Sequence, residues 1–221
     1  MVTRKGVIKK TPLEAYSRPR ANGINAITIR EEDVLLEAKL TNGDDDILMA
    51  LRSGKAIRFP EEKVRSMGRN ASGVRGVSLA DETDEVVGMV TVPPQHEEYS
   101  ILVVSEKGYG KRTVVEDYRT TNRGGKGVKT MSITDKTGGL VAIKAVTDDD
   151  DLMVINRSGV MIRLGMSDLR TMGRATQGVR LINLKKNDRI ASVAKVPASE
   201  EEEADLEKPS ENGTTPEAGE Q

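Results

Sequence analysis

The chain has 221 residues, of which 36% are hydrophobic and only 2% aromatic, and it contains no tryptophan and no cysteine. Any core is therefore aliphatic, and disulfides, thiolate catalysis and zinc–thiolate sites are excluded. No apolar run reaches the roughly 18 residues that a membrane-spanning helix needs, and no signal-peptide pattern opens the chain, so we expect a soluble, cytoplasmic protein without a membrane partner.

The net charge of −1 is the average of two oppositely charged regions. Residues 198–221 hold nine acidic residues and one lysine, a local charge of −8, which leaves +7 on residues 1–197. A basic body favours a polyanionic partner, and an acidic tail could compete with that partner; the alternative is that both charges only keep the protein soluble. The tail has almost no large apolar residues, so we expect it to be disordered.

The sequence repeats itself about every 50 residues. The segments RSMGRNASGVR (65–75) and RTMGRATQGVR (170–180) agree at seven of eleven positions, and looser copies begin at Tyr16 and Tyr118. Repeats of this length are typical of propeller blades or similar four-stranded units, which bury their apolar faces against one another. We place the four repeats at 1–46, 47–98, 99–150 and 151–197. The first repeat has little of its opening strand, which suggests a segment of a longer protein.

In chain order, each repeat shows the signals of four β-strands. A short aliphatic run is followed by a turn ending in glycine, and a second strand carries basic residues near its end. The expected opening strands are 47–51, 101–104 and 152–155. The third strands are expected to start at Ile24, Val74, Val128 and Val179. The expected last strands are Val34–Leu40, Val86–Val92, Leu140–Val146 and Ile190–Val196. Short turns of helix are expected at 60–66 and 166–171. The predicted fold class is all-β, with about four four-stranded antiparallel blades.

The loops between the second and third strands carry the strongest chemical signal. Glycine lets a phosphate approach the backbone closely, and arginine offers it bidentate contacts. The loop arginines Arg20, Arg69, Arg123 and Arg174 take corresponding places, so stacked repeats would align them on one rim that matches the regular charges of a duplex. For one loop alone, turn chemistry with solvated arginines is the commoner explanation, but four equivalent loops favour DNA. The candidate DNA-binding residues are Lys9, Lys10, Arg18, Arg20, Arg58, Arg65, Arg69, Lys111, Arg112, Arg119, Arg123, Gly124, Gly125, Lys126, Gly127, Arg163, Arg170, Arg174 and Arg180.

Other apparent sites follow weaker patterns. The segment 108–113 (GYGKRT) lacks the spacing of a nucleotide-binding loop, and the acidic runs at 44–46 and 148–151 lack the spaced ligands of a calcium loop. We therefore expect no metal, no cofactor and no catalytic residue in this segment. Two alternatives to DNA binding remain: a protein-interaction scaffold, which needs an exposed apolar patch, and an enzyme, which needs a convergent polar pocket.

The order of the motifs resembles that in the C-terminal domain of the DNA gyrase A subunit; the resemblance to the corresponding domain of topoisomerase IV is weaker. The resemblance spans residues 1–197 and rests on GVIKKTPLEAYSR (6–18), RFPEEKVRSMGRNASGVRG (58–76), KGYGKRTVVEDYRTTNRGGKGV (107–128) and MGRATQGVRLI (172–182), followed by the acidic tail. It implies a β-pinwheel, a propeller-like disc whose basic perimeter wraps duplex DNA without reading its sequence and so supports ATP-dependent negative supercoiling by a bacterial type II topoisomerase. The implied partners are duplex DNA, the other gyrase A domains and the gyrase B subunit, at the nucleoid.

The chain departs from that family's pattern in two ways. Gyrase A subunits usually hold six blades with a QRRGGKG box in the first, whereas the four repeats of this chain match the last four. The box-like segment 121–127 lies in the third repeat and lacks the first arginine, which leaves open whether it does the box's work. The catalytic domains are missing, so ATP and magnesium would belong to other parts of the resembled holoenzyme. Whether four repeats close into a ring or form an open arc also stays open.

Overall fold

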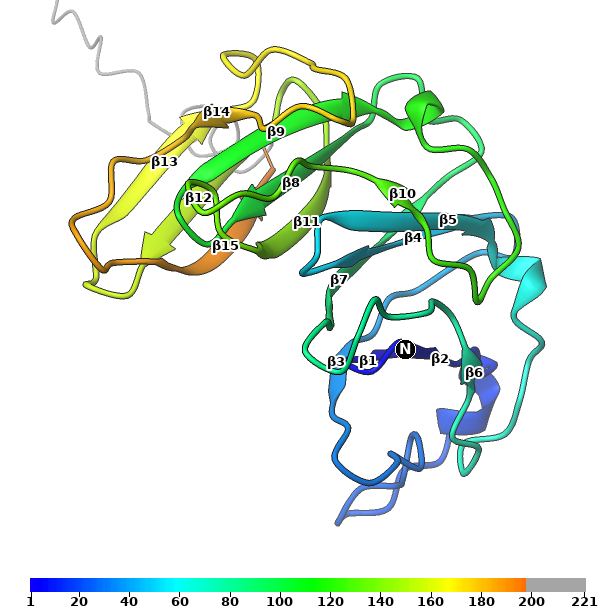
Figure 1. The fold of residues 1–221 in the computed structure, drawn as a ribbon. Coiled ribbons are helices and arrows are strands. Elements are labelled where there is room, and N and C mark those ends of the chain that lie inside the picture. The colour runs from blue at the N-terminus through cyan, green and yellow to red at the C-terminus, as the bar shows by residue number, and fades with distance from the viewer. Residues whose placement is uncertain (198–221) are drawn as a thin grey trace, which may run out of the picture.

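The computed structural model describes residues 1–197, which form four antiparallel sheets arranged as successive blades (Figure 1). We number these blades 1 to 4 along the chain. Blades 1, 2 and 3 have four strands each and blade 4 has three, so the expected all-β class is confirmed. The acidic tail, 198–221, lies outside the described residues.

Within each blade the strands follow one another from the inner edge to the outer edge. Blade 1 contains β3 (Leu35–Glu37), β1 (Val2–Thr3), β2 (Val7–Ile8) and β6 (Val74–Arg75). Blade 2 contains β7 (Val86–Val92), β4 (Asp46–Leu51), β5 (Lys55–Pro60) and β10 (Val128–Lys129). Blade 3 contains β11 (Leu140–Val146), β8 (Ser100–Ser105), β9 (Tyr109–Val114) and β14 (Val179–Arg180). Blade 4 contains β15 (Ile190–Val196), β12 (Asp151–Asn156) and β13 (Met161–Gly165).

Three short 3₁₀ turns follow the second strands: η1 (Leu13–Tyr16), η2 (Glu61–Lys63) and η3 (Val115–Asp117). The turn of helix expected at 60–66 is thus present as η2. The one expected at 166–171 is wrong: this segment makes only a hydrogen-bonded turn, in which the Leu169 amide donates to the Met166 carbonyl at 3.1 Å.

The outermost strand of blades 1 to 3 comes from the following repeat. β6 pairs with β2, β10 with β5 and β14 with β9, and the register is the same each time, with Arg75 opposite Val7, Lys129 opposite Lys55 and Arg180 opposite Tyr109. The third strands expected at Val74, Val128 and Val179 therefore form, but each one lies in the preceding blade. This exchange explains why the strand expected at Ile24 does not form, since residues 1–197 hold no sheet before blade 1 for it to join. It also explains why blade 4 has three strands.

The core consists of three aliphatic clusters that lie between successive blades. One cluster joins blades 1 and 2 through residues such as Ile8, Met49 and Phe59. Another, around Leu48, Val103 and Tyr118, joins blades 2 and 3, and a third joins blades 3 and 4. Because each interface buries apolar side chains from two repeats, no single blade has a complete core of its own.

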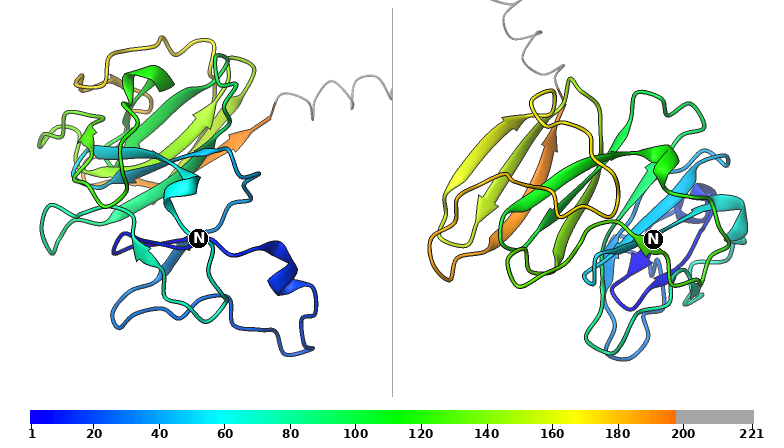
Figure 2. Two further views of the ribbon diagram at one scale, coloured as in Figure 1. Left: turned by 90° about the vertical axis from the view of Figure 1, so that its right-hand side faces the viewer. Right: turned by 45° about the horizontal axis from the view of Figure 1, so that its top comes forward.

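The four blades fan out as an open arc, in which blade 1 and blade 4 lie at opposite ends (Figures 1 and 2). β3, β7, β11 and β15 follow one another along the inner edge, where neighbouring strands are in contact. The strands donated by the next repeat lie on the opposite edge, so the glycine- and arginine-rich loops that precede them run along the outer edge of the arc. The question of a ring or an arc is thereby settled for residues 1–197.

Candidate nucleic-acid interface

Three equivalent loops, which we call the rim loops, run along the outer edge at residues 66–73, 120–127 and 171–178. Each rim loop starts beside the second strand of the preceding blade, through parallel bridges that join Lys10 to Ser66, Arg58 to Thr120 and Arg112 to Thr171. Each ends on a glycine with a positive φ, and at Gly127 (φ +71°) a Cβ would lie 2.5 Å from the Ala56 carbonyl oxygen. Only glycine fits such a position. The loops are therefore fixed to the blades at both ends.

The arginines inside the rim loops connect each loop to the one before it. Each donates a hydrogen bond to a backbone carbonyl of the preceding repeat, two residues after the positive-φ glycine of that repeat. The three contacts are Arg69 to Asn25 at 2.9 Å, Arg123 to Arg75 at 3.0 Å and Arg174 to Lys129 at 2.9 Å. Arg69, Arg123 and Arg174 thus take equivalent places, as expected, and part of each guanidinium is engaged with the chain of the preceding repeat. The same place for Arg20, the fourth arginine of the expected row, stays a prediction.

Two of the candidate lysines lie beneath the loops rather than on them. Lys9 and Lys111 are 1% and 0% exposed, and their ammonium groups donate to backbone carbonyls of the loops above. Lys9 binds the carbonyls of Ala26 and Arg69, and Lys111 binds those of Gly173 and Arg174. Burial lowers the pKa of both lysines, that of Lys111 to about 8. Neither lysine reaches the surface, so both are corrected from candidate phosphate ligands to anchors of the rim loops.

Arg58 and Arg112 are also buried, at 9% and 6% exposure, and both are engaged inside the protein. The Arg58 guanidinium donates to Asp46 at 2.7 Å and to the carbonyls of Val115 and Tyr118 in the next repeat. Arg112 forms an ion pair with Asp148 at 2.6 Å. These arginines lie at equivalent places in blades 2 and 3, and the Arg58 guanidinium also holds the following repeat. Because both side chains are buried, they too leave the candidate interface.

The other candidates lie at or near the surface. Lys10 is half-buried and paired with Glu61 at 3.2 Å, while Arg69 and Arg174 are half-buried through the contacts between loops. Arg163 is exposed on β13 and pairs with Asp151. The exposed candidates on or beside the outer edge are Arg18, Arg20, Arg65, Arg119, Arg123, Lys126, Arg170 and Arg180. These residues remain the candidate contacts to a polyanion.

The box-like loop, 121–127, differs from its neighbours in what supports it. Its Gly124 amide donates to the Gly76 carbonyl at 2.6 Å, so this N–H is not free to bind a phosphate. Gly125 lies directly over Ile57, whose Cδ1 would be 3.5 Å from a Cβ at this position. Lys126 is exposed. The loop therefore carries the exposed Lys126 over an apolar base, whereas the Arg123 guanidinium is engaged with the carbonyls of Lys63 and Arg75.

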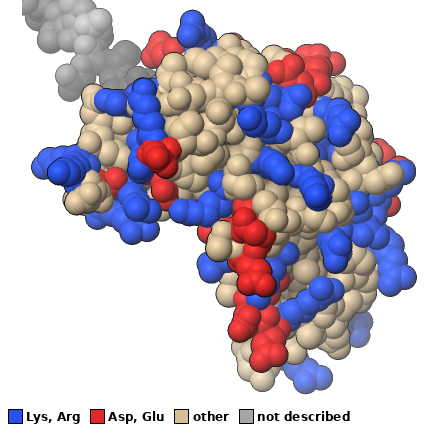
Figure 3. Space-filling view, in the orientation of Figure 1, with Lys and Arg blue, Asp and Glu red and all other residues tan. Residues whose placement is uncertain are grey.

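Sequence reasoning missed two exposed cations, Arg75 and Lys129. They occupy the same register on the outermost strands as Arg180, which was named as a candidate. The repeat itself carried the signal, because in all three cases the residue follows the Gly-Val pair that closes a loop. Figure 3 shows lysine and arginine spread over the face that carries β10 and β6, whereas aspartate and glutamate gather in a column that passes β7 and β3.

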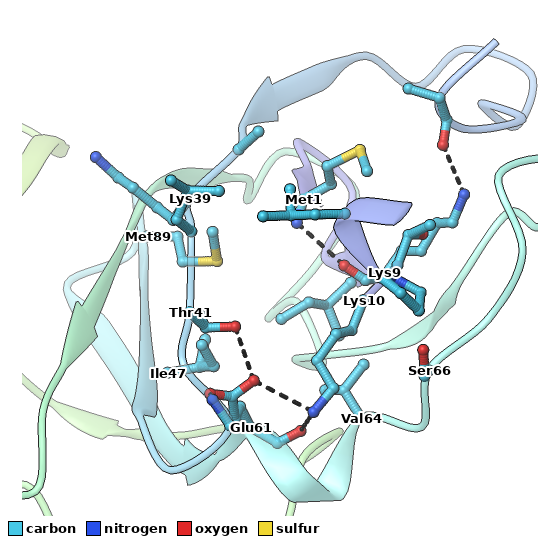
Figure 4. A pocket seen from close by; sticks show the side chains of 18 of the residues that line it. Met1, Lys9, Lys10, Lys39, Thr41, Ile47, Glu61, Val64, Ser66 and Met89 are labelled. Atoms are coloured by element: carbon cyan, nitrogen blue, oxygen red, sulfur yellow. Dashed lines mark hydrogen bonds and ion pairs between the residues drawn. The ribbon is translucent and has the colours of Figure 1, made fainter. Parts of the chain in front are cut away.

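A separate, largely apolar cavity of about 630 Å³ lies between blades 1 and 2. Ile47 and Met89 of blade 2 face Met1 across it, and Lys10 and Thr41 both donate to the Glu61 carboxylate at its floor (Figure 4). Burial acts to raise the pKa of Glu61, but its hydrogen bonds outweigh burial and the pKa is lowered. This carboxylate is therefore a structural link between the two blades rather than a proton donor.

An open arc of strand-exchanged blades with a basic outer edge defines a propeller-like repeat domain. The chain belongs to the family described as "DNA gyrase C-terminal domain, beta-propeller", whose model matches residues 1–42, 45–93, 99–147 and 150–197. Among residues 1–197, no helix has the length and apolar character needed to cross a bilayer.

Sequence and structure comparisons agree with this membership. The DNA gyrase A subunit of Staphylococcus aureus strain MRSA252 is 46% identical over 217 residues, which are 98% of this chain and 24% of that protein. A solved C-terminal domain of DNA topoisomerase IV superimposes with a TM-score of 0.84 at 26% identity, covering 93% of this chain and 64% of that one. A solved DNA gyrase A C-terminal domain gives 0.77, also at 26% identity, covering 88% and 64%. The chain thus spans about a quarter of the length of its curated gyrase relative.

Proposed function

We propose that this chain binds duplex DNA along its outer edge, without sequence specificity, and wraps the duplex around the arc of blades. The main support for the proposal is the row of rim loops. Hydrogen bonds from the loop arginines connect each loop to the preceding repeat. The exposed cations of this row repeat from blade to blade, as the phosphates of a duplex repeat along its axis. Membership in the gyrase C-terminal family supports the same function.

Wrapping requires the contacts to offset the elastic energy of the bent duplex. Bending a site of 20–30 base pairs by 40–90° costs on the order of 1–6 kcal/mol. A curved row of cations meets this cost through many phosphate contacts of small individual strength. In the proposed holoenzyme, wrapping would set the handedness of a DNA crossing and so favour negative supercoiling. Strand cleavage, ATP and magnesium would belong to the other gyrase A domains and the gyrase B subunit, in the cytoplasm and at the nucleoid.

The direct test is ligation of nicked circular DNA in the presence of the protein, followed by counting of the change in linking number. A change proportional to the bound protein supports chiral wrapping by these four blades. Binding with no change in linking number would mean that the outer edge holds DNA without imposing a path. No binding at low salt would overturn the proposal.

The salt dependence of binding tests the role of the exposed rim cations. Neutralising about six phosphates gives a log–log slope of affinity against salt near −5. Lys126→Gln should reduce the size of that slope by about one, because it removes one phosphate contact. The matched control is Lys144→Gln, which makes the same charge change on β11 at the inner edge. Equal effects of the two variants would mean that net charge, and not the rim, controls binding.

The apolar cavity favours a second candidate function, a protein-interaction scaffold. Leu13 and Leu40, which line the cavity, are 65% and 74% exposed, so the described residues offer the apolar surface that such a scaffold requires. DNA binding remains the better supported function because the cavity is confined to one junction, whereas the basic loops recur along the arc. A Leu40→Ser variant should leave DNA affinity unchanged if the outer edge is the interface.

A further inference from the structure

A hollow of about 380 Å³ opens at the junction of blades 3 and 4, beyond the end of the last rim loop. In Figure 3, lysine and arginine gather on this side of the molecule, over the ends of β9 and β14. The residues that line the hollow are Lys107, Tyr109, Lys136, Arg180, Ile182, Leu184, Lys185, Asn187, Asp188 and Arg189. Among the predicted DNA-binding residues, it shares only Arg180 with the rim.

Tyr109 and Arg180 form the centre of the hollow. The pairing of β9 with β14 places them directly opposite one another, and the Arg180 guanidinium donates to the Tyr109 hydroxyl at 2.9 Å. The Lys136 ammonium and the Arg180 guanidinium carbon lie 5.3 and 5.5 Å from the centre of the tyrosine ring. Since the hydroxyl oxygen accepts from Arg180, the phenolic proton can be donated to an anion.

Three exposed lysines surround this pair, and each comes from a different loop: Lys107, Lys136 and Lys185. Within residues 1–197, none of the three forms an ion pair with an acidic side chain. Asp188 also lines the hollow, but its carboxylate accepts from the Ser158 hydroxyl at 2.7 Å and from the Arg189 amide at 2.8 Å. The Lys107 ammonium donates to the backbone carbonyl of Asp135, and Arg189 is paired with Glu106 at 3.1 Å. The hollow still has a net positive charge, from Arg180 and the three lysines.

The repeat architecture does not require this arrangement. The corresponding pairs on the outer edge are Val7 with Arg75 in blade 1 and Lys55 with Lys129 in blade 2, and neither includes a phenol. At the equivalent end of blade 1, Lys5 is paired with Glu32 at 3.3 Å. Bringing like charges together costs energy unless a counter-charge is bound. The concentration of cations around Tyr109 is therefore not explained by the fold that the blades share.

We propose that this hollow, which we call the Tyr109 site, binds a phosphate group, and that its source is a backbone phosphate of the duplex held by the outer edge. The Tyr109 hydroxyl and Arg180 donate to the phosphate oxygens, and Lys107, Lys136 and Lys185 supply the balancing charge. This inference rests on the proposed function and adds to it. Where the duplex passes beyond the last rim loop towards blade 4, one of its phosphates is held in a defined site rather than on an open surface.

Two neighbouring lysines provide the test. Lys185 lines the hollow and Lys186 does not, although both are exposed and carry the same charge. Lys185→Gln should weaken binding of a 30-base-pair duplex about three- to tenfold and reduce the size of the salt slope by about one, with a smaller loss for Lys186→Gln. Tyr109→Phe keeps the ring and removes only the hydroxyl, so it should weaken binding about threefold or more, with only a small fall in melting temperature from the lost hydrogen bond of Arg180.

A titration of the protein alone with inorganic phosphate identifies the source of the anion. The hydrogen bond from Arg180 lowers the pKa of Tyr109, and a bound phosphate should raise it, which tyrosinate absorbance reports by difference from Tyr109→Phe. If phosphate shifts this titration but Lys185→Gln and Lys186→Gln bind duplex equally, the site takes a free anion and its assignment to DNA is overturned.

Equal duplex binding by both lysine variants, by Tyr109→Phe and by the unaltered protein, together with no response to phosphate, would overturn the Tyr109 site entirely. Failure of the proposed function is a different result. In that case even the unaltered protein does not bind duplex at low salt, and the phosphate titration still decides whether the Tyr109 site binds an anion.

Discussion

Blades 2 and 3 differ at one equivalent position of their second strands, where the side chain lies beneath the rim loop. In blade 3, Lys111 on β9 extends beneath the rim loop 171–178 and binds its carbonyls. In blade 2 the equivalent residue on β5 is Ile57, which packs beneath Gly125 of the rim loop 120–127. Blade 1 resembles blade 3, with Lys9 in this place. Two loops are therefore held by buried cations and one by apolar contact.

This difference shows that the number of cations in a sequence is not the number that faces a ligand. A buried lysine that donates to loop carbonyls stabilises the structure and cannot bind a phosphate. Over Ile57, the loop backbone needs no such donor, and its glycines allow it to lie close to the apolar side chain. Arg123 and Lys126 are both exposed on this loop. Blade 2 thus has no buried lysine at this position beneath its rim loop, and both basic residues of the loop itself are exposed.

Removing the apolar support of blade 2 should have the largest effect on stability. Ile57→Ala leaves a cavity in the cluster between blades 1 and 2, where Ile57 is 2% exposed, and should lower the free energy of unfolding by about 2–5 kcal/mol. Urea denaturation measures this loss. The control is Ile57→Val, expected to cost about 0.5–1.5 kcal/mol. If the alanine variant costs no more than the valine variant, the loop does not depend on this side chain.

Removing the cationic support of blade 3 should have a smaller effect, because a gain offsets part of the loss. Lys111→Met leaves the carbonyls of Gly173 and Arg174 without their donor but also removes a buried charge. We expect a net loss of about 1–3 kcal/mol in the same assay. Lys129→Met, at an exposed position, should stay within about 0.5 kcal/mol of the parent. Equal stability of Lys111→Met and the parent would mean that the buried lysine does not hold the loop.

The sequence predicted the repeats and the strands well because both depend on local pattern. The final strands of repeats 2, 3 and 4 were expected at the bounds now observed for β7, β11 and β15. It could not show that each third strand lies in the preceding blade, since a two-residue strand such as Val74–Arg75 carries no information about its partner. That exchange also removed the strand expected at Ile24.

The candidate interface was harder to predict because burial depends on the partner strand. Lys111 lies in β9, in which five of the six residues are buried, and polar residues there gave no sign of being covered by a loop about 60 residues later. The Tyr109 site was missed for a related reason. Its lysines come from three loops that meet only when blades 3 and 4 pack together.

The pH dependence of stability gives the finest test of the comparison between blades 2 and 3. Burial lowers the pKa of Lys111 in the folded protein to about 8, from 10.5 for the free side chain; the nearby Arg174 acts in the same direction and Asp117 opposes it. Between these two pH values the unfolded chain binds one proton more than the folded protein, so stability rises with pH by at most about 1.4 kcal/mol per unit. Below pH 8, both states are protonated and Lys111 contributes no slope. Between pH 7.5 and 9, the unaltered protein should therefore gain about 1 kcal/mol relative to Lys111→Met, measured by urea denaturation. If the free energies of unfolding of the two proteins change with pH in parallel, the Lys111 ammonium is not desolvated beneath the loop. Lys111 and Ile57 would then differ in the shape of the side chain and not in the cost of a buried charge.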